Sequence, residues 1–390
     1  MKKDFFQYQA QTSKHPLGLE VSHAKGSYIF DKKGKAYLDF VAGVSANALG
    51  HQPGEVIEAI KNQLDRYMHV MVYGEFIQKP QVALAKKMGE IMPGNLSKTY
   101  LVNSGTEATE AALKLAKRFT GKAGIIAAKR SYHGNTQGSM SVMDYPERKN
   151  PFMPLIPGVR FIDFNNEEDL KKINTGTAAV ILETIQGGAG FIEPQNGYLK
   201  KVKKRCEETG TLLILDEIQT GFGRTGKMMG FENYGVIPDI VITGKALGGG
   251  MPIGAFTSTP EIMDVLTDPA MGHITTFGGH PVIAAGALAT IQTIEKQQLC
   301  KESLRKEKIL RKGLKHPKIK EIRGKGLMLS LIMETPEQAD KLVLKALENG
   351  LILFWLLYEK RAVRITPPLT ISDDDLYKGI EIIQDLLEEI

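Results

Sequence analysis

The sequence predicts an α/β fold in which a large domain with a mostly parallel sheet is followed by a smaller α/β domain. Two observations support this prediction. Short apolar runs recur along the first part of the chain, and helical patterns separate them. After about residue 290 the pattern changes to a charged helical region followed by further short apolar runs. Alternation of strands and helices favours a parallel sheet with right-handed crossover connections.

The apolar runs of the first part have the lengths of strands that are buried on both faces, as in parallel sheets. They are Thr99–Val102, Ala123–Ala128, Ala178–Leu182, Leu212–Leu215 and Ile240–Thr243. A helix is expected at Tyr198–Thr209, where Leu199, Val202 and Cys206 recur at helical spacing. In open α/β sheets, ligands bind beyond the carboxyl ends of the strands. Polar residues that follow the apolar runs are therefore the first candidates for a site.

Residues 291–390 are expected to form the smaller domain. They contain the apolar run Leu327–Met333, a helical pattern at Pro336–Glu348, and further runs at Leu351–Trp355 and Val363–Ile365. Residues 1–50 are expected to pack with this domain, because Ser27–Phe40 has the texture of a hairpin that turns near Lys33-Gly34. Residues 51–290 would then form the large domain.

The composition argues against several classes of protein. Apolar residues make up 42% and charged residues 24% of the 390 residues, which are ordinary values for a globular chain. No apolar stretch reaches the ~20 residues that a membrane helix needs, and no apolar core of a secretory signal follows the N-terminal lysines. With only Cys206 and Cys300 there is no disulfide framework. We therefore expect a cytoplasmic protein with reduced thiols.

The formal net charge of +6 does not by itself indicate nucleic-acid binding. In the densest basic run, Lys301–Lys320, leucines and isoleucines are interleaved with the lysines, so we interpret it as the solvated face of a helix. Anionic ligands such as phosphate and carboxylate account for a mild positive balance equally well. We expect small-molecule ligands, and no nucleic acid, membrane or metal.

The first candidate motif is Asn103–Ala108, which follows a predicted strand and opens an alanine-rich helix. Ser104 and Glu107 have the spacing of a capping box, which defines the start of a helix. Gly105 lets the backbone approach a ligand closely. Free N–H groups and the helix dipole then form an anion site. On this fragment alone, an ordinary capped helix is an equally good interpretation.

The second candidate is Asp216, which comes directly after the buried strand Leu212–Leu215. A carboxylate at the end of a buried strand is costly unless it has a cationic partner. A protonated pyridine nitrogen is one such partner, and the charge of the carboxylate keeps that ring an electron sink. The alternative is an aspartate that caps the following loop.

The third candidate is Lys245, which follows Ile240–Thr243 and precedes Gly248-Gly249-Gly250. A lysine amine can form an imine with an aldehyde. Burial and nearby positive charge lower its pKa and make it a better nucleophile and base. A single lysine before a loop is usually solvated, so this assignment depends on the other motifs.

Two further segments supply groups for a flat, phosphorylated ligand. Tyr132, in Ser131-Tyr132-His133-Gly134, could stack on a heteroaromatic ring; a core aromatic residue is the alternative. The loop Thr275–Pro281 offers hydroxyl and backbone donors in a glycine-rich setting.

Together these segments closely resemble the class III aminotransferases, which are pyridoxal-phosphate (PLP) enzymes of fold type I. This family includes ornithine, acetylornithine and 4-aminobutyrate aminotransferases. The resemblance extends from roughly Ser27 to Leu369, and the segment Asp216–Gly226 (DEIQTGFGRTG) is its longest and most specific motif. The family implies the PLP-dependent transferase fold, a homodimer with shared active sites, and two half-reactions that exchange an amino group between an amine donor and a keto acid.

The resemblance also implies a role for each matching residue. Lys245 would carry PLP as a Schiff base and move the proton between carbon atoms, and Asp216 would pair with the pyridine nitrogen. The remaining cofactor-binding residues would be Gln219 at the ring hydroxyl, Tyr132 on the ring face, Ser104, Gly105 and Thr106 at the phosphate, Glu183, and Thr276 at the phosphate of the neighbouring subunit's cofactor. Arg364, in Arg364-Ile365-Thr366-Pro367-Pro368-Leu369, resembles the family arginine that binds a substrate carboxylate, for which its planar fork is suited. A surface arginine at a strand end is the alternative.

The sequence departs from the best-known members of the family at two substrate positions. A glutamate that holds the carboxylate-binding arginine aside is replaced by Gly188, and Thr184 replaces a proline in the same segment. An arginine that contacts the distal carboxylate of the donor is replaced by Asn135. Removing one partner of a buried charge pair costs roughly 2–5 kcal/mol. We therefore expect a donor whose far end is uncharged or masked, such as an ω-amine, a β-amino compound or an aminoacyl thioester, with Trp355 and Tyr358 lining its path.

Several functions remain open on the sequence. The leading one is transfer from an ω- or β-amino donor to 2-oxoglutarate or pyruvate. Alternatives are an ornithine, acetylornithine or 4-aminobutyrate aminotransferase proper, and a PLP isomerase that resembles glutamate-1-semialdehyde aminomutase and needs no external keto acid. A PLP decarboxylase and a non-enzymatic binding protein are weaker options.

Overall fold

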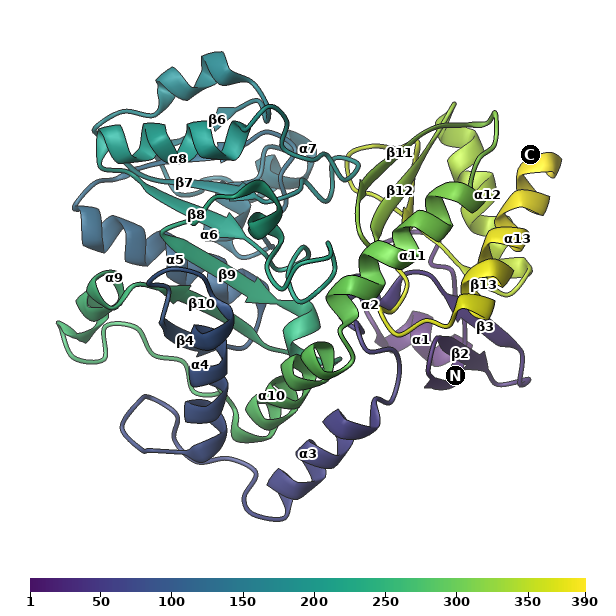
Figure 1. Ribbon diagram of the computed structural model, residues 1–390, viewed down its shortest axis with the longest axis horizontal. Coiled ribbons are helices and arrows are strands. Elements are labelled where there is room, and N and C mark those ends of the chain that lie inside the picture. Colours follow the sequence, from purple (N-terminus) through teal and green to yellow (C-terminus); the bar gives the residue numbers. More distant parts are fainter.

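The computed structural model describes all residues 1–390, and a seven-stranded sheet lies at the centre of its larger part (Figure 1). The strand order is β4-β10-β9-β8-β7-β5-β6. The strands β9, β8, β7, β5 and β6 run parallel, whereas β10 is antiparallel to both of its neighbours. Their bounds are β4 (Lys98–Val102), β5 (Gly124–Ala128), β6 (Val159–Ile162), β7 (Thr177–Glu183), β8 (Leu212–Asp216), β9 (Ile240–Gly244) and β10 (Gly254–Ser258). The expected mostly parallel sheet is confirmed.

Both faces of this sheet are buried, which explains why its strands have continuous apolar runs. In β8, Leu213 and Leu215 belong to one hydrophobic cluster, while Leu212 and Ile214 belong to another. The helix α5 (Gly105–Thr120) contributes to the second cluster and α8 (Tyr198–Thr209) to the first. The helix expected at Tyr198–Thr209 is confirmed, because Leu199, Val202 and Cys206 all point into the core.

A second, four-stranded sheet lies in the C-terminal part of the chain. Its order is β11-β12-β15-β14, with β11 (Ile319–Lys325), β12 (Met328–Met333), β14 (Phe354–Trp355) and β15 (Ala362–Ile365). The helices α11 (Leu299–Gly313), α12 (Pro336–Glu348) and α13 (Asp373–Glu389) accompany it (Figure 1). The basic run at Lys301–Lys320 is thus helical only as far as Gly313, and β11 begins at Ile319.

A third small sheet joins the N-terminal segment to the C-terminal part of the chain, and both lie in the same half of the molecule in Figure 1. It contains β1 (Val21–Lys25), β2 (Tyr28–Asp31), β3 (Ala36–Asp39) and β13 (Leu351–Ile352). The hairpin expected near Lys33-Gly34 is confirmed, and Gly34 has a φ of 82°. The apolar run Leu351–Trp355 does not form one continuous strand. The run divides into β13, which pairs with β3, and β14, which pairs with β15, so it belongs to two sheets.

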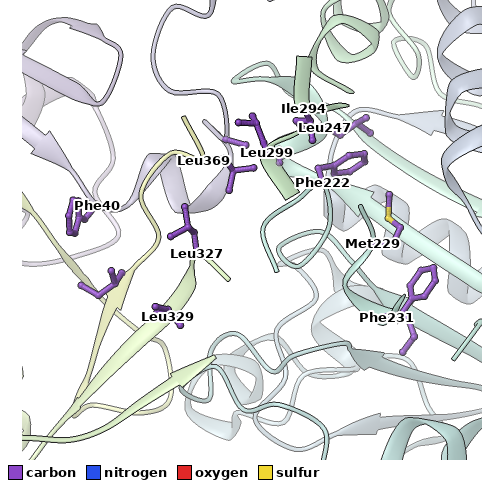
Figure 2. Packing of buried hydrophobic residues seen from close by; sticks show 14 of the residues in the cluster. Phe40, Phe222, Met229, Phe231, Leu247, Ile294, Leu299, Leu327, Leu329 and Leu369 are labelled. Carbon is purple, nitrogen blue, oxygen red and sulfur yellow. The ribbon is translucent and has the colours of Figure 1, made fainter. Parts of the chain in front are cut away.

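One hydrophobic core of 59 buried residues connects the large sheet with the terminal segments. Figure 2 shows this core, with Phe222, Met229 and Phe231 on one side and Phe40, Leu327 and Leu329 on the other. Leu299 and Leu369 lie between the two groups. Because the packing is continuous, the C-terminal sheet is held firmly against the carboxyl ends of the parallel strands.

The remaining elements are shorter or connect the sheets. The helices are α1 (Lys2–Tyr8), α2 (Ala42–Ser45), α3 (Gly54–Leu64), α4 (Lys79–Ile91), α6 (Gln137–Ser141), α7 (Pro146–Lys149), α9 (Pro260–Asp264) and α10 (Pro281–Lys296). The 3₁₀ turns are η1 (Asn150–Phe152), η2 (Glu167–Lys172), η3 (Gly230–Tyr234), η4 (Lys245–Gly248) and η5 (Val265–Thr267). None of the helices combines the length and the apolar character needed to cross a bilayer.

Candidate active site

A cavity of about 540 Å³ lies where the carboxyl ends of the parallel strands meet the C-terminal sheet. Most of the residues singled out in the sequence line it. The complete lining is Val44, Gly105, Thr106, Tyr132, His133, Gly134, Asn135, Arg148, Glu183, Gly188, Asp216, Ile218, Gln219, Lys245, Phe354, Trp355, Leu357 and Arg364. The fold thus brings together residues that are up to 320 positions apart, from Val44 to Arg364.

Lys245 stands at the end of β9, where the strand turns into η4. Its φ of 43° lies in the left-handed region, which is uncommon for a residue with a side chain. Burial, and then the charge of Arg364, lower the pKa of the Lys245 amine to about 8, although Asp216 and Glu183 oppose this shift. The amine is therefore closer to its neutral, nucleophilic form than that of a solvated lysine.

Asp216 ends β8 and is buried. One carboxylate oxygen lies 2.7 Å from Nδ1 of His133, and the other accepts a hydrogen bond of 2.9 Å from the backbone N–H of Ile218. Asp216 therefore does cap the loop that follows β8, as the alternative interpretation expected. The same residue also lines the cavity. His133 is a partner that the sequence reasoning did not identify. Its position in the Ser131–Gly134 segment was a signal, since that segment also follows a strand.

Glu183 ends β7 and lies directly beside Asp216 in the register of the sheet. Its carboxylate accepts hydrogen bonds from the backbone N–H groups of Tyr132 (3.0 Å) and Gly187 (2.9 Å). Burial raises the pKa of Glu183 to about 7; the charge of His133 opposes this rise, and Asp216 adds to it. Two adjacent buried carboxylates are costly to maintain, which favours a cationic group in the cavity between them and Lys245.

The N-terminus of α5 faces the cavity through Gly105 and Thr106. Ser104 is the N-cap and accepts a hydrogen bond of 3.3 Å from the N–H of Glu107. The expected capping box is only half formed, because the Glu107 carboxylate accepts from the backbone N–H of Asn103 rather than from that of Ser104. Ser104 is not among the cavity-lining residues, so its structural role as a helix cap is the one observed.

Several buried polar atoms of the site have no hydrogen-bond partner within the chain, among them atoms of Gln219 and Arg364. The amide nitrogen of Gln219 is buried without a hydrogen-bond partner. Arg364, in β15, is also buried, and its Nε and Nη1 atoms have no partner. Its guanidinium carbon lies 5.3 Å from the centre of the Phe191 ring, and burial lowers its pKa to about 10. Unsatisfied buried donors are rare in native proteins, so these atoms fit an anionic or hydrogen-bond-accepting ligand. The surface-arginine alternative for Arg364 is wrong.

Arg224, within the Asp216–Gly226 motif, connects this site to the C-terminal sheet. Its guanidinium is completely buried and donates to the carbonyl oxygens of Leu327 (3.0 Å) and Pro367 (2.6 Å). Pro367 follows β15 closely, so Arg224 fixes the chain that carries Arg364. The motif therefore stabilises the junction as well as lining the cavity.

The substrate positions Asn135 and Gly188 both line the cavity. Asn135 is exposed, and its amide donates to the Tyr132 hydroxyl over 3.2 Å. Gly188 is covered by Tyr358: a Cβ atom at position 188 would lie 2.8 Å from the edge of the tyrosine ring. The ring is held by a hydrogen bond of 2.7 Å from its hydroxyl to the Ser131 carbonyl. Space that a side chain at position 188 would need is thus already filled.

Thr184, the other departure from the family pattern, has a structural partner. Its hydroxyl donates to the buried carboxylate of Glu217. That carboxylate also accepts from the Thr220 hydroxyl (2.9 Å) and from the N–H groups of Gly230 (2.6 Å) and Phe231 (2.9 Å). Glu217 therefore holds the ends of β7 and β8 against η3, and Thr184 contributes to this network.

Thr276, like Ser104, is a predicted site residue that does not line this cavity. It is exposed, and it is absent from the lining residues. The basic residue Arg148, by contrast, lines the cavity, although no motif in the sequence indicated it.

This fold and site define a family of aminotransferases. A model of that family, described as aminotransferase class-III, matches residues 8–387, so the chain belongs to it. The chain is 38% identical over 378 residues to the acetylornithine aminotransferase of Caldanaerobacter subterraneus subsp. tengcongensis, and the match covers 94% of each chain. It is also 38% identical over 380 residues to the putrescine aminotransferase of Pectobacterium atrosepticum, where the match covers 93% of this chain and 81% of the relative.

A solved structure agrees with these relationships. The ornithine aminotransferase of Toxoplasma gondii ME49 superimposes with a TM-score of 0.91 at 32% identity, covering 100% of this chain and 96% of that one. The fold is therefore that of the PLP-dependent transferases of fold type I, the chain is a class III aminotransferase, and its cofactor is PLP.

Proposed function

We propose that this aminotransferase takes the amino group of an ω- or β-amino donor with an uncharged or masked far end, and passes it to a keto acid in a two-step exchange. The observation that carries the donor assignment is the contact between Gly188 and Tyr358. Because the ring stands 2.8 Å from where a Cβ atom would be, no acidic side chain at position 188 can hold Arg364 aside. Asn135 offers an amide where a charged contact would otherwise select a carboxylate tail.

We assign the cofactor's binding groups to the lining of the cavity. PLP supplies an aldehyde that condenses with amines and a ring that delocalises negative charge from the substrate carbon. Asp216, oriented by His133, would hold a proton on the ring nitrogen. The free Gln219 amide would donate to the ring hydroxyl. Gly105 and Thr106 would bind the phosphate at the N-terminus of α5, with Ser104 supporting them as the cap.

The face of the ring and its far edge would be held by two further residues. Tyr132 would stack on the ring, because its side chain lines the cavity and Asn135 fixes its hydroxyl. Glu183 anchors the backbone N–H of Tyr132 and would set the position of that side chain. Both residues would therefore exclude water from the reacting side of the cavity.

Lys245 would supply the covalent attachment and the proton transfers. Its Nζ amine is partly buried at the end of β9, and its lowered pKa of about 8 leaves a useful neutral fraction at physiological pH. Once released by the incoming donor, the amine would take a proton from the substrate carbon as a general base and return it as a general acid. Arg364 would bind the carboxylate of the keto acid through its unpartnered Nε and Nη1 atoms.

A half-reaction screen tests the donor assignment. The PLP-loaded enzyme is mixed with single amines, and conversion of the cofactor to its amino form is followed by absorbance. We expect putrescine and other amines with no carboxylate at the far end to react with higher kcat/KM than ornithine, acetylornithine or 4-aminobutyrate. The reverse preference would contradict the proposal and support an ornithine-, acetylornithine- or 4-aminobutyrate-type enzyme.

The same assay distinguishes the proposed aminotransferase from the remaining alternative, a PLP isomerase. An isomerase of the glutamate-1-semialdehyde aminomutase type would turn over without an added keto acid, whereas the proposed enzyme requires 2-oxoglutarate or pyruvate for a second turnover. The relative named putrescine aminotransferase supports the choice of donor, since putrescine carries no carboxylate.

We further propose that the enzyme acts as a cytoplasmic homodimer with shared active sites. Thr276 is exposed outside its own cavity, where it could reach the phosphate bound by a second copy.

Both cysteines are free thiols, in keeping with a reducing compartment. Residues 51–290 would form the large domain, and residues 1–50 would pack with residues 291–390 through the pairing of β3 and β13.

A further inference from the structure

Arg148 is a basic side chain of the cavity that has no role in the function proposed above. It extends from the short helix α7 and lines the same cavity as Arg364. It is exposed, whereas Arg364 is buried. The two guanidinium groups therefore differ in depth: one lies inside the cavity and the other at its mouth.

The guanidinium of Arg148 is held by aromatic contacts. Its carbon atom lies 5.2 Å from the centre of the Tyr145 ring. The Tyr145 ring packs edge-on against Tyr358, with 5.1 Å between ring centres and 87° between planes. Tyr358 is in turn fixed by its hydrogen bond to the Ser131 carbonyl. Stacking orients a guanidinium without using its in-plane N–H donors.

Those donors are free to bind a ligand. Arg148 takes part in none of the ion pairs of the molecule. Its charge nevertheless acts on the cavity. Burial raises the pKa of Tyr132, and the charge of Arg148 opposes this rise. Burial and Glu183 raise the pKa of Tyr358, and Arg148 again opposes them. An oriented and unpaired guanidinium beside a substrate cavity is suited to a planar anion such as a carboxylate.

We propose that Arg148 binds the second carboxylate of a dicarboxylic keto acid whose first carboxylate is bound by Arg364. This inference rests on the proposed function and specifies its acceptor: a dicarboxylate such as 2-oxoglutarate is preferred to the monocarboxylate pyruvate. Asn135 carries no charge and His133 is paired with Asp216, so Arg148 is the one cationic group of the lining, besides Lys245 and Arg364, that has no acidic partner. It therefore determines specificity for the acceptor, and Tyr145 is its positioning residue.

The direct test uses Arg148→Gln in the acceptor half-reaction, starting from the amino form of the enzyme. A hydrogen bond to a charged group contributes about 1.5–3 kcal/mol, so kcat/KM for 2-oxoglutarate should fall about 10- to 100-fold. The value for pyruvate should change less than about twofold. Arg148→Lys, which keeps the charge but loses the fork, should give an intermediate loss for 2-oxoglutarate. An equal loss for both acceptors, or no loss for 2-oxoglutarate, would overturn the proposal.

Lys149→Gln is a matched control for the change of charge. Lys149 is the next residue on α7, but its amine donates to the Met143 carbonyl over 3.0 Å and lies 4.7 Å from the Phe161 ring centre, away from the cavity lining. We expect this variant to retain the preference for 2-oxoglutarate. A loss like that of Arg148→Gln would show that overall charge attracts the acceptor, and would count against a specific contact.

The positioning role of Tyr145 has its own pair of variants. Tyr145→Leu removes the stacking partner and should raise KM for 2-oxoglutarate with little change in kcat. Tyr145→Phe retains the ring and should restore the wild-type KM. If both variants behave alike, the stacking contact does not position Arg148.

A binding measurement separates this inference from the proposed function. Glutarate is an unreactive dicarboxylate probe and butyrate an unreactive monocarboxylate probe. Trp355, the single tryptophan of the chain, lines the cavity and reports their binding by fluorescence. The PLP-loaded enzyme should bind glutarate at least about tenfold more tightly than butyrate, and Arg148→Gln should abolish this difference. This outcome is independent of which donor reacts. Equal binding of the two probes by the wild-type enzyme would contradict the role of Arg148.

Discussion

The amine of Lys245 lies in an environment that disfavours its positive charge. Burial and the charge of Arg364 lower its pKa to about 8, against the pull of Asp216 and Glu183. Below that pH the amine is protonated and cannot attack an electrophile, and above it the amine is neutral and reactive. A solvated lysine reaches the same state only near pH 10.4.

We therefore predict that Lys245 in the cofactor-free enzyme is modified by acetic anhydride with a half-maximal rate near pH 8. Peptide mass spectrometry after competitive labelling gives this midpoint directly. The same lysine in the denatured chain serves as the control and should show the midpoint of an ordinary lysine. A folded-state midpoint at or above pH 10 would contradict the environment described for this amine.

Gly188 and Tyr358 form a second residue-scale prediction. Gly188→Ala would place its Cβ atom 2.8 Å from a ring that is held by a hydrogen bond and by aromatic contact with Tyr145. Overpacking of this kind costs typically about 1–3 kcal/mol, so the free energy of unfolding should fall by that amount. In the Tyr358→Ala background the same substitution should cost almost nothing.

A double-mutant cycle based on denaturant unfolding measures this coupling. Additive effects of the two substitutions would mean that the ring does not occupy the space beside Gly188. In that case the absence of an acidic side chain at position 188 would need another explanation.

For single residues, the sequence predicts which side chains form the site better than it predicts which side chains they contact. Asp216, Glu183, Gln219, Lys245 and Arg364 follow from a motif comparison, and all of them line one cavity. The partner of Asp216 was not predicted, because a histidine in a loop has no preferred pairing until the fold brings it close. Arg148 had no signal at all, since its function depends on a stacking contact that sequence spacing does not encode.

The helix α5 and the loop before α6 together shape the end of the cavity where we propose that the phosphate binds. Gly134 has a φ of 130°, and a Cβ atom there would lie 2.3 Å from the Thr106 hydroxyl oxygen. That hydroxyl is hydrogen-bonded to Thr136 (2.8 Å) and Ser139 (2.7 Å). A side chain at position 134 would therefore displace Thr106 from the start of α5.

We predict that Gly134→Ala weakens PLP binding by about tenfold or more, because the loss of one hydrogen bond to a charged group has about this effect. Retention of the cofactor during dialysis, followed by absorbance, measures this. Gly121→Ala is the control: Gly121 caps the other end of α5 with a φ of 69° and has open space around it. It should cost roughly 1–2 kcal/mol of stability and leave cofactor retention unchanged. If Gly134→Ala also retains PLP, the loop does not shape the phosphate site.

Elements with a strong pattern were predictable, and those defined by their neighbours were not. The helices α8 and α12 begin and end at the predicted residues, because their apolar spacing and capping residues are local signals. The strand β10 (Gly254–Ser258) was not predicted, because this short segment contains one glycine and two hydroxyl residues and so has no continuous apolar run. The division of Leu351–Trp355 depends on two different partner strands, which lie far away in the sequence.

Two exposed apolar segments lie together on the surface of the molecule. One covers residues 68–77 and contains Ile77, which is 97% exposed. The other covers residues 271–277 and contains Phe277, which is 54% exposed. The rings of His69 and Phe277, one from each segment, are 5.0 Å apart between centres, so the segments are adjacent. Contiguous exposed apolar side chains are typical of an interaction surface, and Thr276 lies within this one.

We predict that the protein sediments as a dimer at micromolar concentration, and that the double variant Ile77→Asp, Phe277→Asp shifts it towards monomer. The variant should also lose PLP more readily, because Thr276 would no longer reach a neighbouring site. Leu344→Asp on α12 is the control, since Leu344 is 48% exposed but lies in a different part of the chain. A wild-type monomer that retains PLP fully would contradict the shared site.

At the scale of the whole molecule, the alternation of apolar runs with helical patterns and the change of pattern near residue 290 were sufficient to predict the fold class. The continuous core was not predictable. Phe40 and Leu329 belong to the same hydrophobic cluster as Phe222 and Leu247 of the large part. Contacts of this kind depend on how the two ends of the chain meet, and pairwise packing over hundreds of residues leaves no periodic signal.

The proposed chemistry depends on Lys245 as the site of cofactor attachment. Treating the PLP-loaded enzyme with sodium borohydride makes the covalent link permanent, and peptide mass spectrometry then locates it. We predict that the mass of the reduced cofactor is found on the peptide that contains Lys245, at close to one per chain, and that Lys245→Ala carries none. A cofactor attached to a different lysine in the wild-type enzyme would contradict the account.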